Sequence, residues 1–212
     1  MTLVDTDYID HLLKTSRLNG PVLELGAGIS EHSCRELVLQ YSLEHTGTDI
    51  AGQADVFADF EDKSSVAAAF AGHRPFDSAL ILNVLEHCFD PVAILDNTIS
   101  LLEPGGVCVV ITPCIWPIHS FPVDCWRPLP DFYRRYAISR NLHLLEDEFR
   151  FLPYGRIADY TGQDGQVQNP LISSSASYML YSRLIHRLFN TTGRGTRFPT
   201  HLAIGVIFIK QD

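Results

Sequence analysis

The sequence is short of basic residues. Its 212 residues include 16 lysines and arginines against 25 aspartates and glutamates, which gives a net charge of −9. Proteins that bind nucleic acid usually neutralise phosphates with a basic surface. The charge therefore argues against a nucleic-acid partner, whereas a small anionic substrate needs only a local basic cluster.

Long apolar runs and cysteine pairs are also missing. No apolar stretch approaches the roughly 18–20 residues that span a bilayer, and the first residues lack the pattern of a secretory signal. The five cysteines form no Cys-x-x-Cys pair, which is typical of reduced thiols. We therefore expect a cytoplasmic protein with no membrane partner, present as a monomer or homodimer.

With 46% hydrophobic residues and no visible linker or repeat, the chain is expected to form one domain over residues 1–212. Short apolar runs alternate with helical patterns, which favours a parallel sheet covered on both faces. Strands are expected at residues 22–25, 43–50, 56–60, 76–83, 107–112, 142–152 and 202–210. Helices are expected at residues 6–18, 31–40, 64–70, 91–102, 131–140 and 178–189.

The most informative stretch is residues 22–30, Val-Leu-Glu-Leu-Gly-Ala-Gly-Ile-Ser. An apolar run, a Gly-x-Gly turn and a helix-compatible segment follow one another, as at the opening of a nucleotide-binding α/β domain. A dinucleotide site would have a third glycine where Glu31 stands. Glu24 is also a poor neighbour for a pyrophosphate and a good one for an amino cation, so a nicotinamide-dependent oxidoreductase is disfavoured.

Further signals follow the glycine turn in order. Asp49 ends the second expected strand, and the pair Asp59-Phe60 closes the third. Residues 76–87 read Phe-Asp-Ser-Ala-Leu-Ile-Leu-Asn-Val-Leu-Glu-His. They are expected to form a buried strand that is followed by the pair Glu86-His87. Residues 101–106, Leu-Leu-Glu-Pro-Gly-Gly, lead into the next strand. Carboxylates at neighbouring strand ends are suited to bind ribose hydroxyls or an amino group.

Over residues 21–112 this order resembles the class I S-adenosylmethionine-dependent methyltransferases, of the type that acts on small molecules. The resemblance and the strand order predict a Rossmann-like, doubly wound, mostly parallel seven-stranded sheet with an antiparallel C-terminal strand. They also predict a cofactor-binding core at 1–140, a C-terminal substrate cap inserted at 153–200 and the final strand at 201–212. The implied cofactor is S-adenosyl-L-methionine, with S-adenosyl-L-homocysteine as product. The implied cofactor-binding residues are Glu24, Gly26, Ala27, Gly28, Asp49, Asp59, Phe60 and Asn83.

The catalytic candidates follow the fourth and fifth expected strands, where open α/β sheets place their sites. His87 and His119 are suited to act as a general base, and Asp124 could orient one of them. Either histidine could instead be a packed side chain, and Asp124 with Arg127 could be a salt bridge that shapes the loop. No third ligand accompanies His119 and Asp124, so no metal site is expected.

The substrate candidates lie in the same loop and are Trp116, Trp126 and Arg127. Tryptophans in such a loop serve either as anchors or as platforms for a ring. We expect methyl transfer to a small molecule in biosynthesis, to a hydroxyl of a sugar or natural-product intermediate. The alternatives are N-methylation of a small amine and a non-catalytic module that binds S-adenosylmethionine.

Overall fold

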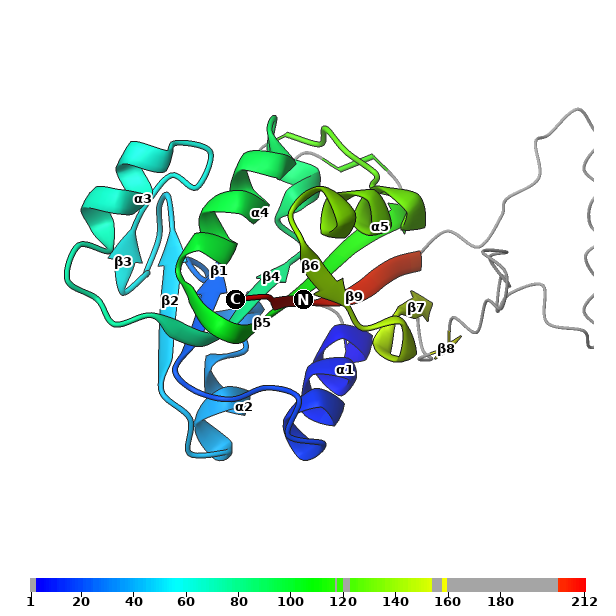
Figure 1. Ribbon diagram of the computed structural model, residues 1–212, viewed down its shortest axis with the longest axis horizontal. Helices are drawn as coiled ribbons and strands as arrows, with labels where there is room; N and C mark the ends of the chain where they lie inside the picture. The colour runs from blue at the N-terminus through cyan, green and yellow to red at the C-terminus, as the bar shows by residue number, and fades with distance from the viewer. Residues whose placement is uncertain (1–2, 117, 120–122, 154–157, 160–201) are drawn as a thin grey trace, which may run out of the picture.

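The central strand β1 (Val22–Leu25) is buried along its whole length, because sheet neighbours flank it and helices cover both faces. Residues 3–116, 118–119, 123–153, 158–159 and 202–212 are described by a computed structural model (Figure 1). β1 pairs in parallel with β2 on one side and β4 on the other. The parallel strands, in spatial order, are β3 (Val56–Phe57), β2 (His45–Asp49), β1, β4 (Phe76–Leu82) and β5 (Leu102–Ile115).

The C-terminal part of the sheet is antiparallel. The long, apolar β9 (Leu202–Lys210) runs antiparallel to β5 and is buried over most of its length. On its other side β9 pairs with β6 (Leu142–Leu144) and β7 (Arg150–Pro153), and β8 (Ala158–Asp159) pairs with β7. The expected antiparallel C-terminal strand is therefore confirmed.

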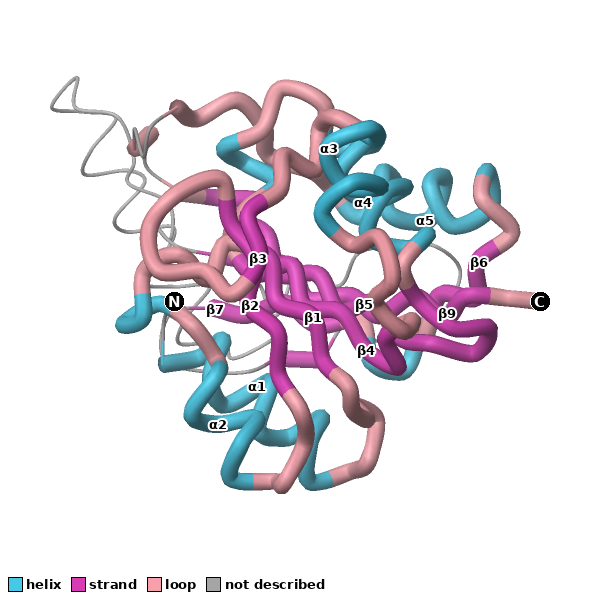
Figure 2. The backbone as a smooth tube through the Cα atoms, turned by 90° about the vertical axis from the view of Figure 1, so that its left-hand side faces the viewer, coloured by secondary structure: helices cyan, strands magenta, loops and turns pink. Residues whose placement is uncertain are grey.

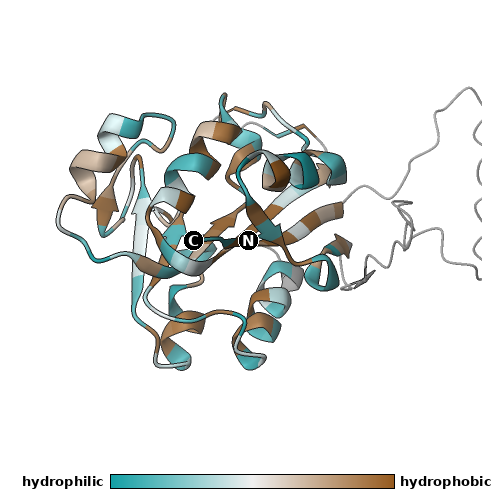
Figure 3. Ribbon diagram, viewed as in Figure 1, coloured by the Kyte–Doolittle hydropathy of each residue, from teal (hydrophilic) through white to brown (hydrophobic). Residues whose placement is uncertain are grey.

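Helices cover the sheet on two faces (Figures 1 and 2). One face carries α3 (Lys63–Ala69), α4 (Pro91–Ser100) and α5 (Pro130–Ser139). The other carries α1 (Leu3–Lys14) and α2 (Arg35–Gln40), whose buried residues form a second apolar cluster. Apolar residues run through the central strands between these layers (Figure 3). No helix among the described residues is long and apolar enough to cross a membrane.

The described sheet has nine strands, so the expected number of seven is wrong. The single strand expected at 142–152 is divided into β6 and β7 by the short 3-10 helix η3 (Glu146–Glu148), and β8 is additional. Three consecutive acidic residues in η3 do not suit a buried strand, and the turn breaks the ladder at that point. The Pro-Gly-Gly stretch at 104–106, which was expected to precede the strand at 107–112, lies inside β5, where the pairing with β4 shifts register.

The predicted cap at 153–200 lies almost entirely outside the described residues, as does the helix expected at 178–189. Its division from the 1–140 core stays a prediction. Two further 3-10 helices, η1 (Ser30–His32) and η2 (Leu85–His87), follow β1 and β4 respectively. Both lie just after strand ends, and η2 carries part of the candidate site.

Candidate active site

The glycine turn after β1 is shaped by close contacts that exclude side chains. Gly26 has a φ of +76°, and a Cβ there would lie 2.7 Å from the Val84 side chain. A Cβ on Gly28 would lie 2.3 Å from the Ala51 carbonyl oxygen and 2.7 Å from Oδ2 of Asp49. Between them Ala27 is buried. The turn is therefore held between the loop after β2 and the loop after β4.

Asp49 at the end of β2 is tied to this turn through its carboxylate. Oδ2 accepts a hydrogen bond from the backbone N–H of Gly28 at 2.9 Å. Oδ1 accepts from the N–H groups of Ile50 at 2.7 Å and Ala51 at 3.2 Å. Backbone donors thus fix the orientation of the carboxylate at the carboxyl edge of the sheet, and the ribose contact of Asp49 stays a prediction.

The side chain of Glu24 lies on the face of β1 that α1 and α2 cover. Its carboxylate oxygens contact other groups of the protein. Its carboxylate accepts from the Ser33 hydroxyl at 2.6 Å and from the N–H of Cys34 at 2.8 Å. A ring nitrogen of His45 lies 2.7 Å from Oε2. Glu24 is 1% exposed, and these contacts supply the partners that its buried carboxylate oxygens need. Its predicted contact with the cofactor is untested, whereas its role in holding η1 and β2 is visible.

The other predicted cofactor residues occupy different surroundings. Asp59 is exposed, and its carboxylate accepts from the N–H of Glu61 at 2.9 Å. The ring of Phe60 is buried against Phe70, and its carbonyl oxygen accepts a buried hydrogen bond from the Asn97 amide at 2.8 Å. Asn83 has a φ of +55°, and its side-chain amide donates to Asp5 at 3.0 Å. Phe60 therefore serves as a core residue in this structure.

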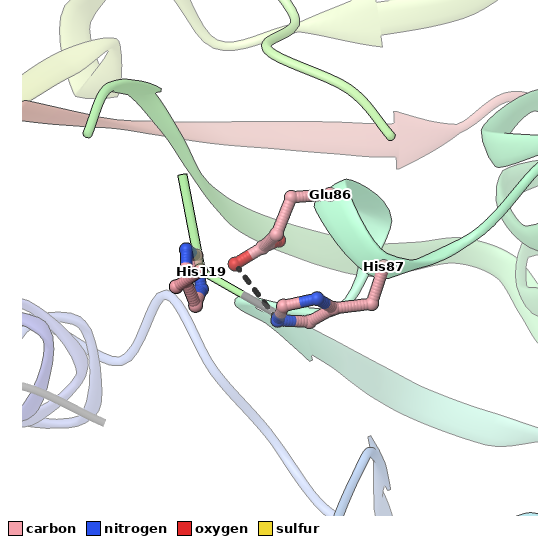
Figure 4. Close-up of side chains that lie close together, drawn as sticks. All are labelled: Glu86, His87 and His119. Carbon is pink, nitrogen blue, oxygen red and sulfur yellow. Dashed lines mark ion pairs between the residues drawn. The ribbon is translucent and has the colours of Figure 1, made fainter. Parts of the chain in front are cut away.

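A second group of side chains lies after β4 and β5. Glu86 and His87 come from η2, and His119 comes from the segment after β5 (Figure 4). Their ligating atoms all lie within 4.8 Å of one another, and Oε1 of Glu86 is 3.7 Å from Nε2 of His87. The two imidazole rings meet edge to face with centroids 5.0 Å apart. The structure thus brings the two predicted histidines together.

Each histidine has an orienting partner. Nδ1 of His87 lies 2.6 Å from the carbonyl oxygen of Val123, which only accepts, so the proton of neutral His87 resides on Nδ1. Nδ1 of His119 lies 3.4 Å from Asp124, and the backbone N–H of His119 donates to the same carboxylate at 2.9 Å. The predicted orienting role of Asp124 is consistent with this geometry.

Asp124 also pairs with Arg127. Two guanidinium nitrogens contact the carboxylate, with Nη2 2.6 Å from Oδ2. These hydrogen bonds hold the pKa of Asp124 well below its usual range, although partial burial acts in the opposite direction. The ion pair is the loop-shaping alternative considered for Arg127.

The loop after β5 is fastened onto η2 by backbone and side-chain bonds. The N–H groups of Cys125 and Trp126 donate to the carbonyl oxygen of Glu86 at 2.6 and 3.3 Å, and the Trp126 indole donates to Phe89 at 3.0 Å. A cavity of about 210 Å³ opens in this loop. Its lining includes all three predicted substrate residues and consists of Trp116, Ile118, Asp124, Cys125, Trp126 and Arg127.

Sequence reasoning assigned no role to Glu86. Glu86 is fully buried, and neither carboxylate oxygen has a hydrogen-bond partner among the described residues. Burial raises the pKa of Glu86 to about 8. The available signal was an acidic residue four positions after the end of a buried apolar strand and directly before a histidine. What the sequence could not give was its burial beside His119.

Three kinds of comparison bear on this arrangement, and the first is with curated proteins. An O-methyltransferase of ubiquinone biosynthesis from Parvibaculum lavamentivorans is 30% identical over 108 residues, which are 51% of this chain and 40% of that protein. A protein of the same name from Psychrobacter cryohalolentis is 48% identical over 48 residues, 23% of this chain and 18% of that protein. The chain therefore spans less than half the length of these curated relatives.

Solved structures share the fold. A methyltransferase from Archaeoglobus fulgidus, described as dependent on S-adenosylmethionine, superposes with a TM-score of 0.56 at 16% identity, covering 97% of this chain and 94% of the other. An N-methyltransferase from Burkholderia thailandensis, solved with S-adenosylhomocysteine, gives a TM-score of 0.56 at 10% identity over 98% and 78%. The expected Rossmann-like fold is confirmed.

The family assignment rests on a further match. The model of a methyltransferase domain family covers residues 4–162, which is most of the chain and includes the glycine turn, Asp49 and the histidine cluster. The match agrees with the resemblance deduced from residues 21–112 and with S-adenosylmethionine as the predicted cofactor. This chain belongs to the methyltransferase domain family.

Proposed function

We propose that this protein transfers the methyl group of S-adenosylmethionine to a hydroxyl of a small molecule. One observation carries the proposal: the glycine turn lies against the loop that bears the histidine cluster. The space for a Cβ on Gly26 is filled by Val84, which stands two residues before Glu86. A cofactor on the turn and an acceptor at the cluster would therefore be neighbours at the carboxyl edge of the sheet.

The cofactor would lie along the glycine turn. Asp49, already oriented by three backbone donors, would accept hydrogen bonds from the ribose hydroxyls. Asp59 is exposed and would contact the adenine side of the site together with the backbone of Phe60. Asn83 and the backbone around Gly26, Ala27 and Gly28 would border the methionine part. Glu24 would support the turn through its hydrogen bonds with Ser33 and Cys34.

The acceptor would approach from the loop after β5. Methyl transfer is an in-line displacement, so the acceptor oxygen must lie about 3 Å from the methyl carbon and lose its proton. We assign proton removal to His119, held by Asp124, with His87 beside it. The cavity of about 210 Å³ has room for roughly one ring, since an engineered cavity of about 150 Å³ holds benzene. Trp116 and Trp126 would flank that ring, and Arg127 would border it.

The names of the relatives favour oxygen as the acceptor atom, because the curated proteins that match are called O-methyltransferases. A similar fold is also found in an N-methyltransferase, so the fold alone does not select oxygen over nitrogen. A panel of phenols, sugars and amines, with S-adenosylhomocysteine release as readout, separates these acceptors. A wild-type protein that binds the cofactor and turns over none of them would be a binding module.

Calorimetric titration with S-adenosylmethionine and S-adenosylhomocysteine tests the cofactor assignment. We expect both to bind, and we expect Asp49→Ala to weaken S-adenosylhomocysteine at least tenfold, because the ribose contacts and the anchor of Gly28 are lost together. Asp131→Ala removes a carboxylate that is 85% exposed on α5 and is the matched control. Absence of binding to the wild type at high micromolar ligand would overturn the proposal.

A further inference from the structure

The cluster of Glu86, His87 and His119 has a composition that the methyl-transfer chemistry does not require. Each side chain offers one ligating atom, and the three atoms lie within 4.8 Å of one another. Figure 4 shows the Glu86 carboxylate directed at the His87 ring, with His119 alongside. We propose that these three residues bind one divalent metal ion of the zinc class.

The missing hydrogen bonds of the buried Glu86 carboxylate are an independent observation in favour of a ligand. Glu86 is 0% exposed, and both oxygens lack hydrogen-bond partners among the described residues. A buried polar group without a partner is rare in folded proteins and costs free energy. Glu24 is buried to the same extent, yet its two oxygens contact Ser33, Cys34 and His45. A cation beside Glu86 would supply the contact that the polypeptide leaves out.

The histidines are held as metal ligands usually are. A ligating imidazole commonly donates its second N–H to a backbone carbonyl or carboxylate, which fixes the tautomer and directs the other nitrogen to the metal. Nδ1 of His87 meets the carbonyl oxygen of Val123 at 2.6 Å, and its Nε2 faces Glu86. Asp124 lies 3.4 Å from Nδ1 of His119. Both arrangements come from the segment that is fastened onto η2.

Two imidazoles and one carboxylate suit zinc, which accepts this set in catalytic sites with the fourth position open. Tetrahedral geometry with bonds of about 2.0–2.1 Å places ligand atoms roughly 3.3 Å apart. The Glu86–His87 pair is at 3.7 Å, close to that value. The widest separation, at most 4.8 Å, would contract on binding. His119 is 36% exposed, so its side chain has room for this adjustment.

The consequence for catalysis rests on the proposed function. An acceptor hydroxyl in the fourth position would have its pKa lowered by the cation, because a bound divalent ion stabilises the oxyanion. With the ion bound, His119 acts as a ligand, and the hydroxyl releases its proton to solvent because its pKa is lowered, so no protein base is needed. The position of the cluster after β4 and β5 places the ion on the acceptor side of the glycine turn.

Titration of the chelator-treated full chain with zinc chloride and cobalt chloride tests the site. We expect one ion per chain and the visible absorption of tetrahedral cobalt(II). Glu86→Gln, His87→Ala and His119→Ala should each weaken binding at least tenfold. His143→Ala, an exposed histidine on β6, is the matched control and should bind like the wild type.

Circular dichroism and S-adenosylhomocysteine affinity are measured on every variant. His119 is the most accessible of the three side chains, so His119→Ala keeps the test decisive if Glu86→Gln unfolds. The proposal is overturned if the wild type binds no ion, or if the folded cluster variants bind as tightly as the wild type. A protein that binds S-adenosylhomocysteine but no metal contradicts the metal site alone, and the proposed methyl transfer survives that result.

Discussion

At the scale of single residues, the glycine turn depends on the absence of Cβ atoms at Gly26 and Gly28. A Cβ on Gly28 would lie 2.3 Å from the Ala51 carbonyl oxygen in the loop after β2 and 2.7 Å from the carboxylate of Asp49, the last residue of β2. Real Cβ atoms do not approach backbone oxygens so closely. Space, rather than a positive φ, therefore requires glycine at position 28.

Gly28→Ala should separate the two loops and disturb the carboxylate of Asp49. We expect at least tenfold weaker S-adenosylhomocysteine binding, with a loss of stability of roughly 1–3 kcal/mol from overpacking. Gly72→Ala is the control for affinity: nothing lies within 4 Å of the added Cβ, and the φ of +84° strains the backbone there, so this variant should lose stability without losing affinity. Calorimetry and urea unfolding give the two quantities. Unchanged affinity in Gly28→Ala would show that the turn does not position the cofactor.

Two buried glutamates illustrate what residue type alone predicts. Glu24 was expected beside a cationic cofactor, and the structure shows its carboxylate turned to the α1 and α2 face, where Ser33, Cys34 and His45 contact it. Glu86 was given no role, and its carboxylate has no hydrogen-bond partner among the described residues. Both residues follow apolar neighbours in the sequence. Their environments differ because the alternation of β1 and the turn of η2 direct them to different partners.

At the scale of elements, Asp96 joins α4 to the end of α5. Its carboxylate accepts from the Tyr136 hydroxyl at 2.8 Å and from Nε and Nη2 of Arg140 at 2.7 and 2.8 Å. Partial burial acts to raise the pKa of Asp96, but the hydrogen bonds from Arg140 and Tyr136 outweigh it, so the pKa lies below its ordinary value. The junction is therefore sensitive to acid.

A lowered folded-state pKa contributes stability above the unfolded value of about 3.9, and this contribution is lost as pH falls through the folded pKa. Asp96→Asn should therefore destabilise the protein at pH 6 and have a smaller effect at pH 3. The difference is about 0.5–1 kcal/mol, since solvent screens a side chain that is 38% exposed. Urea unfolding at several pH values measures it. A destabilisation that is the same at every pH would contradict the assignment.

At the scale of the whole molecule, the glycine turn and Asp49 join loops after β1, β2 and β4, and the sheet connects those loops to both helical layers. A ligand that binds only the folded form stabilises the whole cooperative unit. At a hundred times its Kd, S-adenosylhomocysteine would add about 2.7 kcal/mol. For a chain of this size we expect a rise in Tm of roughly 5–11 °C.

Differential scanning fluorimetry with increasing S-adenosylhomocysteine measures this rise. Asp49→Ala at the same ligand concentration should show a smaller rise, because its affinity is lower. A Tm that is insensitive to saturating ligand would contradict a cofactor site shared by three loops.

Local patterns in the sequence determined the parallel part of the fold, the glycine turn and the family resemblance. Strand hydrophobicity, turn glycines and acidic strand ends are properties of short segments, so they can be recognised without knowledge of tertiary contacts. The division of 142–152 into β6 and β7 could not be predicted from the sequence, since it depends on how both strands pair with β9. Nor could the meeting of Glu86 with His119, which lie on the segments after two different strands. Only the folding of the loop after β5 onto η2 decided which side chains share the site, because that contact joins residues far apart in the chain.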